Sequence, residues 1–353
     1  MGGRMPISAA DAINPAFQHA KRQLLQPFQL GQWVRLALVG LLAGEMGSGF
    51  NLHTTHHQGP AHLLNAEWLS RLAEYPGLTG GLIALLVVVG AVLVVLVLYI
   101  NSVMRFVLFD SVVAKECHIR AGWARRHSQG LRLFGWQIMV TLAGLASVTM
   151  VIGIPVAGAW SAGWLEHPRA HLVPLVLSGV GLFALLACVV AVFAVVHVMT
   201  KDFVVPQMAL ENISALEGWR RLWTWMKEEK GGYAGYIVMK IVLAIGAGIV
   251  LGIVTVVAML VLLIPFGTVG IGAVLLGKVA GWTWNWETIA MAVAFGCVAL
   301  AVFLFVAALI AVPAIVFFPA YSIYFLAARY APLANVLWPR AARDDGALAP
   351  AEG

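Results

Sequence analysis

The stretch that decides the fold is 213-ISALEGWRRLWTWMKEEKGGYAGYIVMK-240, which leads into a run without charged residues over 241–277. In its first half, apolar side chains recur at helical intervals opposite charged ones such as Glu217 and Arg220, which is typical of an amphipathic helix. Ser214 and Glu217 have the spacing of a capping box at the start of such a helix. The stretch therefore predicts an amphipathic helix at a membrane surface, followed by a membrane span.

The same arrangement occurs three times along the chain. Each copy has two adjacent basic residues, then an aromatic and glycine-containing entry, then a long apolar run. The pairs are Lys21-Arg22, Arg125-Arg126 and Arg220-Arg221. We interpret the copies as three parallel repeats, over residues 8–110, 111–207 and 208–330, each consisting of a cytoplasmic amphipathic helix and a transmembrane hairpin. A pseudo-threefold arrangement about the membrane normal follows as a hypothesis.

The composition excludes a water-soluble domain. Hydrophobic residues make up 61% of the 353 residues and charged residues only 11%, whereas soluble domains have about 25% charged residues. Runs without charge long enough for a membrane-spanning helix cover residues 75–104, 133–165, 170–200, 241–277 and 288–328. A sixth span is predicted over 33–50 because the repeat requires it, although Glu45 and several glycines interrupt it. The predicted fold is thus an all-α integral membrane protein of six transmembrane helices, forming one domain over 1–340, with a disordered tail over 341–353.

The basic residues indicate the orientation in the membrane. Of the 22 Lys and Arg residues, three (Arg71, Arg169 and Lys278) fall in alternate loops and Lys240 falls inside a span, which leaves 18 in the other segments. Because basic residues accumulate on the cytoplasmic side, both termini are predicted to be cytoplasmic. The tryptophans agree with this arrangement, since all 13 lie near predicted span ends or in loops.

Polar residues within the spans are the first candidates for function. Glu45 lies ten residues after Arg35, which corresponds to a depth of about 15 Å in a helix, so it is predicted to be protonated, paired or facing a wet cavity. Alternatively, the first helix is short and Glu45 reaches the outer headgroups. Lys240 and His197 lie near the cytoplasmic ends of their spans, where snorkelling of the lysine and simple packing of the histidine are the alternatives to a functional role.

Two further groups of residues could bind ligands. The basic residues Lys21, Arg22, Arg125, Arg126, Arg220 and Arg221 are candidate contacts to anionic lipid headgroups. Four histidines, His53, His56, His57 and His62, crowd one extracytoplasmic loop and could bind zinc, copper or nickel. Neither an HExxH motif nor a carboxylate at ligand spacing accompanies them, so we interpret the loop as solvated and predict no metal and no cofactor.

Known catalytic signatures are missing from the chain: it has no phosphate-binding GxxxxGK[ST], no GxSxG and no HExxH. The basic residues follow membrane borders rather than forming a patch for nucleic acid. We therefore predict a non-enzymatic membrane protein whose partners are membrane lipids, in particular anionic ones, acting as a transporter-like or lipid-handling module. The alternative is a scaffold or accessory subunit that docks an unidentified protein partner through its interfacial helices.

The N-terminal stretch from Ala12 to Trp33, together with Phe203-Val-Val-Pro206 and Gly218-Trp-Arg-Arg221, resembles uncharacterised bacterial multi-pass membrane proteins. These are similar to the membrane domain attached to some glycerophosphodiester phosphodiesterases. The resemblance implies a bacterial cytoplasmic (inner) membrane protein without an assigned reaction. The phosphodiesterase catalytic domain, with its histidine and acidic metal site, is missing here, so the resemblance does not imply that activity.

Overall fold

The apolar runs form long helices in the computed structural model, which describes residues 8–45, 76–164, 171–281 and 285–338. All regular structure in these residues is helical. Five helices are long and apolar enough to cross a membrane: α4 (Pro76–Ala114), α5 (Ile119–Ser161), α6 (Leu172–Met199), α9 (Lys230–Val279) and α10 (Trp286–Ala327). The chain is therefore a multi-pass, all-helical membrane protein.

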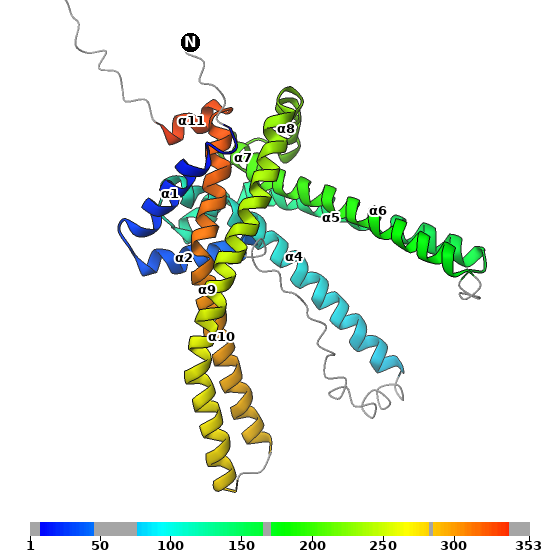
Figure 1. The fold of residues 1–353 in the computed structure, drawn as a ribbon, viewed down its shortest axis with the longest axis vertical. Coiled ribbons are helices and arrows are strands. Elements are labelled where there is room, and N and C mark those ends of the chain that lie inside the picture. Colours follow the sequence, from blue (N-terminus) through cyan, green and yellow to red (C-terminus); the bar gives the residue numbers. More distant parts are fainter. Residues whose placement is uncertain (1–7, 46–75, 165–170, 282–284, 339–353) are drawn as a thin grey trace, which may run out of the picture.

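Shorter helices gather around one end of the long ones. They are α1 (Ile13–Leu25), α2 (Leu30–Leu42), the π-helix η2 (Thr200–Val204), α7 (Val205–Glu211), α8 (Ala215–Glu228) and α11 (Ala331–Leu337). Together with the adjoining ends of the long helices they form a buried core (Figure 1). Three apolar arms extend from this core, namely α4, the α5–α6 hairpin and the α9–α10 hairpin (Figure 1).

Aromatic side chains fill the centre of the core. Phe203, Tyr236, Tyr321 and Phe325 are fully buried. The rings of Tyr236 and Tyr321 stack with centroids 5.2 Å apart, and Phe325 lies 4.7 Å from Tyr236. Such ring pairs contribute about 0.5–1.5 kcal/mol each beyond the burial of their area. Phe203 also contacts Tyr236, so these rings join η2, α9 and α10 within the core.

The arms, in contrast, expose their apolar side chains over most of their length. Leu145, Val176 and Ile264 are 63%, 64% and 68% exposed, and four of the five long helices bury none of their most apolar stretch. A surface of this kind is unfavourable in water but suits the hydrocarbon of a membrane, because every backbone hydrogen bond is made within the helix. The relative placement of the arms thus depends on the core.

The predicted sixth span is not present as a long helix in the described residues. The α2 helix ends at Leu42 and has 13 residues, which gives a length of about 20 Å, whereas the hydrocarbon is about 30 Å thick. Leu36 and Val39 of α2 are fully buried, and the helix packs against α4 and α10. The α2 helix therefore belongs to the core, and residues 46–50 of the predicted span lie outside the described residues.

The three predicted amphipathic segments differ from one another. One half of the predicted capping box of α8 is present, since Ser214 Oγ accepts a hydrogen bond from the Glu217 backbone N–H at 3.2 Å, while the Glu217 carboxylate contacts Arg220 and Arg221. The second segment is not a separate helix, because α5 runs continuously from Ile119 into its span. In α1, Ala20 and Leu24 are buried in the core, but Phe17 is 58% exposed.

A close contact between α4 and α5 depends on a glycine. A Cβ atom placed on Gly130 would lie 2.5 Å from Val103 Cγ2 and 2.9 Å from Val103 Cα, whereas one on Gly135 of the same helix would meet nothing within 4 Å. We expect Gly130→Ala to lower the free energy of unfolding in detergent by about 1–3 kcal/mol, as for other overpacked sites. Gly135→Ala, the matched control, is expected to leave it unchanged or raise it by up to about 1 kcal/mol through helix propensity. Equal stability of the two variants would contradict the contact.

Candidate functional site

A buried carboxylate, Asp202, lies where η2 meets α9. Its side chain is 1% exposed. It accepts a hydrogen bond from the Tyr236 hydroxyl at 2.8 Å and forms an ion pair with the Lys240 ammonium group. Lys240 is itself largely buried, so the lysine that the sequence predicts to snorkel has a carboxylate partner inside the core.

A second ion pair joins two segments that are distant in the sequence. Lys201, the neighbour of Asp202, contacts the Glu45 carboxylate at the end of α2. The Glu45 side chain is 3% exposed. Among the states predicted for Glu45, the structure has the paired one.

Arg105 of α4 is the third cation in this region. It is 6% exposed. Its Nη2 lies 3.0 Å from His197 Nε2, and its Nε lies 3.4 Å from the Ala43 carbonyl oxygen. Because a guanidinium can only donate, His197 Nε2 accepts this bond, which corresponds to a neutral imidazole with its proton on Nδ1.

The three cations of this region border apolar runs of the sequence. Arg105 directly follows the run that ends at 104, Lys201 follows the run that ends at 200, and Lys240 precedes the run that begins at 241. We call the group Glu45, Arg105, His197, Lys201, Asp202 and Lys240 the boundary cluster, because its contacts bring these borders together in space. Glu45, which follows α2, also belongs to the boundary cluster. The end of α2 therefore lies close to the points where the long helices leave their apolar runs.

A change of helix type positions the centre of the boundary cluster. The π-helix η2 directly follows α6, and α7 then begins at Val205, with Pro206 in its first turn. A π-helical turn widens the helix locally and is frequent at functional sites. Here the neighbouring residues Lys201 and Asp202 reach partners on different elements, Glu45 after α2 and Lys240 on α9.

The charges of the boundary cluster do not balance. Three cationic side chains, Arg105, Lys201 and Lys240, face two carboxylates, Glu45 and Asp202. The two lysines are in ion pairs, while no ion pair within the described residues includes Arg105. With His197 neutral, one positive charge is in excess at a buried position, and such a charge is costly unless an anion or water compensates it.

Sequence reasoning found half of this site. It singled out Glu45, His197 and Lys240, which the structure brings into one cluster, but it treated Arg105 and Lys201 only as markers of orientation. It missed Asp202 altogether. The available signal was a carboxylate directly after an apolar run, beside a lysine and four residues before Pro206.

The candidate headgroup contacts fall into two groups. Lys21, Arg22, Arg125 and Arg220 are exposed at the outside of the core. Arg126, in contrast, forms a two-pronged ion pair with Asp110, at 2.7 and 2.8 Å, and donates to the Ala209 carbonyl oxygen at 2.7 Å. It therefore ties the start of α5 to α4 and α7.

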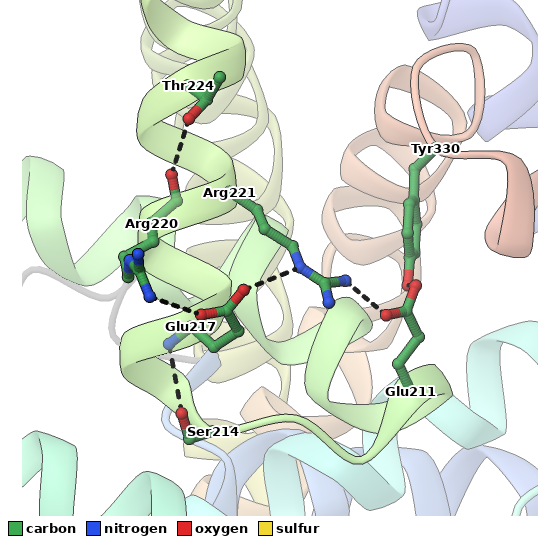
Figure 2. Close-up of polar contacts among 7 residues, drawn as sticks. All are labelled: Glu211, Ser214, Glu217, Arg220, Arg221, Thr224 and Tyr330. Atoms are coloured by element: carbon green, nitrogen blue, oxygen red, sulfur yellow. Dashed lines mark hydrogen bonds and ion pairs between the residues drawn. The ribbon is translucent and has the colours of Figure 1, made fainter.

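Arg221 also has carboxylate partners, as Figure 2 shows. It lies between Glu217 of its own helix and Glu211 of α7, and Glu211 in turn accepts a hydrogen bond from the Tyr330 hydroxyl at 2.6 Å. The hydrogen bond to Glu211 raises the pKa of Arg221. Burial, and then the Glu211 bond, raise the pKa of Tyr330 well above its usual range. This network joins α7, α8 and the end of α10.

The histidine loop cannot be placed, since His53, His56, His57 and His62 lie outside the described residues. Within the described part of the chain, no group of three or more His, Cys, Asp or Glu side chains could hold a metal ion.

Comparison with known proteins gives one family match. A family model described as "Family of unknown function (DUF7544)" matches residues 7–336. No curated protein and no solved structure matches the chain significantly. None of these comparisons links the chain to glycerophosphodiester phosphodiesterases.

The Asp202–Lys240 pair makes a prediction about stability. Removing one partner of a buried ion pair costs about 3–5 kcal/mol, so Asp202→Asn should lower the free energy of unfolding in detergent by roughly that amount. The double variant Asp202→Asn/Lys240→Met should recover much of the loss, because no buried charge is then left unpaired. Arg220→Gln is the control, since the Arg220 side chain is 77% exposed and surface ion pairs contribute about 0–1 kcal/mol. A double variant no more stable than Asp202→Asn would contradict the pairing.

Proposed function

The chain belongs to DUF7544, a family of unknown function, and we propose that this member is a non-enzymatic, lipid-handling or transporter-like module of a bacterial inner membrane. The observation that carries the proposal is the boundary cluster, in which buried cations outnumber carboxylates where the apolar helices meet the core. A site with excess positive charge at this level suits the anionic headgroups of lipids.

The exposed basic residues support the same function. Lys21, Arg22, Arg125 and Arg220 lie on the core side of the apolar arms. Each cation near an anionic membrane surface contributes about 1 kcal/mol of attraction. Together they would hold the core against the cytoplasmic leaflet and concentrate anionic lipids around it.

The proposal includes an orientation and a number of spans. The core and both termini lie in the cytoplasm, and six spans form three parallel repeats. The basic residues of the sequence support this arrangement, because 18 of 22 fall in the segments assigned to the cytoplasm.

Cysteine labelling tests the orientation. In a background without the three native cysteines, a membrane-impermeant maleimide is added to intact cells that have a permeabilised outer membrane. We expect Ser161→Cys, Gly281→Cys and His62→Cys to react, and Ser8→Cys and Arg125→Cys to react only after the inner membrane is opened. Reaction of Arg125→Cys and Ser161→Cys from the same side would refute the orientation, and reaction of Ser8→Cys and His62→Cys from the same side would refute the sixth span.

Native mass spectrometry tests the lipid preference. The full chain in mild detergent is titrated with phosphatidylglycerol or phosphatidylcholine, and we expect it to retain the anionic lipid preferentially. The variant with Lys21, Arg22, Arg125 and Arg220 all changed to Gln should retain fewer copies, because its surface attraction for anionic lipid falls by up to about 4 kcal/mol. Lys278→Gln, a change at the distal end of α9, serves as the control and should behave like the wild type. Equal retention of both lipids by the wild type would refute the lipid-handling function.

The scaffold alternative rests on the outer face of α8. Leu216 and Trp223 are 62% and 55% exposed there, beside exposed Arg220, and Lys227 Nζ lies 5.7 Å from the centre of the Trp223 ring. An apolar and basic face of this kind can contact a partner protein as well as a membrane surface. Recovery of a stoichiometric protein partner, lost in a Leu216→Ser/Trp223→Ser variant while lipid retention is unchanged, would favour the scaffold.

A further inference from the structure

A cavity of about 370 Å³ lies beside the boundary cluster, between α4, α5 and the end of α6. Its volume is within the range of about 300–1,000 Å³ that is usual for small-molecule sites. One face of each of these helices lines the cavity. Its polar lining side chains include Asn101, Arg105, Gln137, Thr141, His197 and Thr200. Its apolar lining side chains include Val97, Leu98, Val140 and Val196.

A buried amide in this cavity lacks a partner. Gln137 is 9% exposed. Its Oε1 shares the Ser102 hydroxyl proton with the Leu98 carbonyl oxygen, at 2.7 and 2.8 Å, and its Nε2 is buried with no hydrogen-bond partner in the described residues. An unsatisfied buried donor costs about 1–3 kcal/mol. An acceptor oxygen in the cavity would remove that cost.

Arg105 supplies the charge of the cavity. It lines both the cavity and a smaller adjoining gap of about 30 Å³ that contains the carboxylates Glu45 and Asp202. On the cavity side, none of the described lining residues is acidic. The Arg105 guanidinium thus separates the region of the two carboxylates from a cavity with hydrogen-bond donors and no negative charge.

The two hydroxyl groups of the lining are already engaged. Thr141 Oγ1 donates to the Gln137 carbonyl oxygen, and Thr200 Oγ1 donates to the Val196 carbonyl oxygen while it accepts from the Trp219 indole. Besides the Asn101 amide, the cavity therefore offers the Gln137 amide and the Arg105 guanidinium, whose planar donors match the oxygens of a phosphate or carboxylate. With a buried cation and no acidic lining residue, it suits an oxyanion.

The polarity of the cavity follows the direction of the helices. On α4, which runs towards the core, Val97 precedes Arg105 by two turns. On α5, which runs away from the core, Val140 follows Gln137. Apart from Thr141, which follows Val140, the apolar lining on these two helices lies towards the membrane arms and the polar lining towards the core, in the same order as the acyl chains and headgroup of a lipid.

We propose that this cavity binds a phosphate diester or monoester, with Arg105 and the Gln137 amide as its donors, and that the phosphate belongs to a phospholipid which enters between α4 and the α5–α6 hairpin. The proposal rests on the lipid-handling function and names its specific site. A soluble phosphate compound has the same chemistry and is the other possible source.

The test uses the full chain in detergent and two variants of the cavity. Gln137→Met removes the donor and the unsatisfied amide at similar volume, and Arg105→Gln removes the charge. Gln18→Met is the matched control, because Gln18 is exposed on α1. For each protein, the melting temperature and the native mass spectrum are recorded with phosphatidylglycerol, with phosphatidylcholine and with inorganic phosphate.

We expect phosphatidylglycerol to raise the melting temperature of the wild type and of Gln18→Met, as binding to the folded state requires, and to bind both cavity variants at least tenfold more weakly. Without lipid, Gln137→Met should melt no lower than the wild type, a result that a purely structural role for the amide would not give. If Arg105→Gln does not fold, the binding of phosphatidylglycerol by Gln137→Met alone tests the site.

The outcomes separate this inference from the general function. Preferential binding of phosphatidylglycerol by the wild type, unchanged in Gln137→Met and in any folded Arg105→Gln protein, would overturn the site but leave the lipid-handling function standing. No preference for phosphatidylglycerol by the wild type would overturn both. Stabilisation by inorganic phosphate alone, lost in the cavity variants, would keep the oxyanion site and assign it to a soluble ligand.

Discussion

Buried charge at the membrane border is the constraint on which the rest of the structure depends. A lysine or carboxylate cannot remain unpaired where the helices leave the hydrocarbon, because its desolvation is too costly, and here its partners come from other segments. Lys201 pairs with Glu45, 156 residues earlier in the chain, and Lys240 pairs with Asp202. These pairs, with the aromatic packing of Tyr236 beside them, determine which helix ends meet and therefore where the arms begin.

Beyond this core the arms bury few side chains against one another. In a membrane they do not need such contacts to be stable. Helices satisfy their own backbone hydrogen bonds in lipid, and lipid tails solvate exposed side chains such as Leu145 and Ile264 as well as protein would. The spaces between arms are therefore natural positions for lipid. The cavity between α4, α5 and the end of α6 lies where two of these arms join the core, so the proposed lipid between the arms would have its headgroup next to Arg105.

The sequence predicts those features that depend on local composition. Five spans follow from the length of the apolar runs, and the cap of α8 follows from Ser214 and Glu217. It cannot predict that α2 stays in the core, because that depends on the partner of Glu45, which lies in the second repeat. For the same reason the three basic pairs look alike in sequence but differ in structure. Arg126 contacts Asp110 of the preceding helix, while Arg22 remains exposed.

The repeat offers a physical explanation for the excess charge. In the proposed repeat, Phe106-Val107-Leu108-Phe109, Phe203-Val204-Val205-Pro206 and Val316-Phe317-Phe318-Pro319 correspond to one another, which makes the residues before them, Arg105, Asp202 and Ile315, equivalent positions. All three are buried, and Ile315 packs against Gly40 of α2. One equivalent position thus carries a cation, one an anion and one an apolar side chain. Lys240 and Tyr236 already occupy Asp202, and an isoleucine cannot pair with a guanidinium, so these equivalent positions provide no dedicated carboxylate for Arg105, and a bound anion would balance its charge.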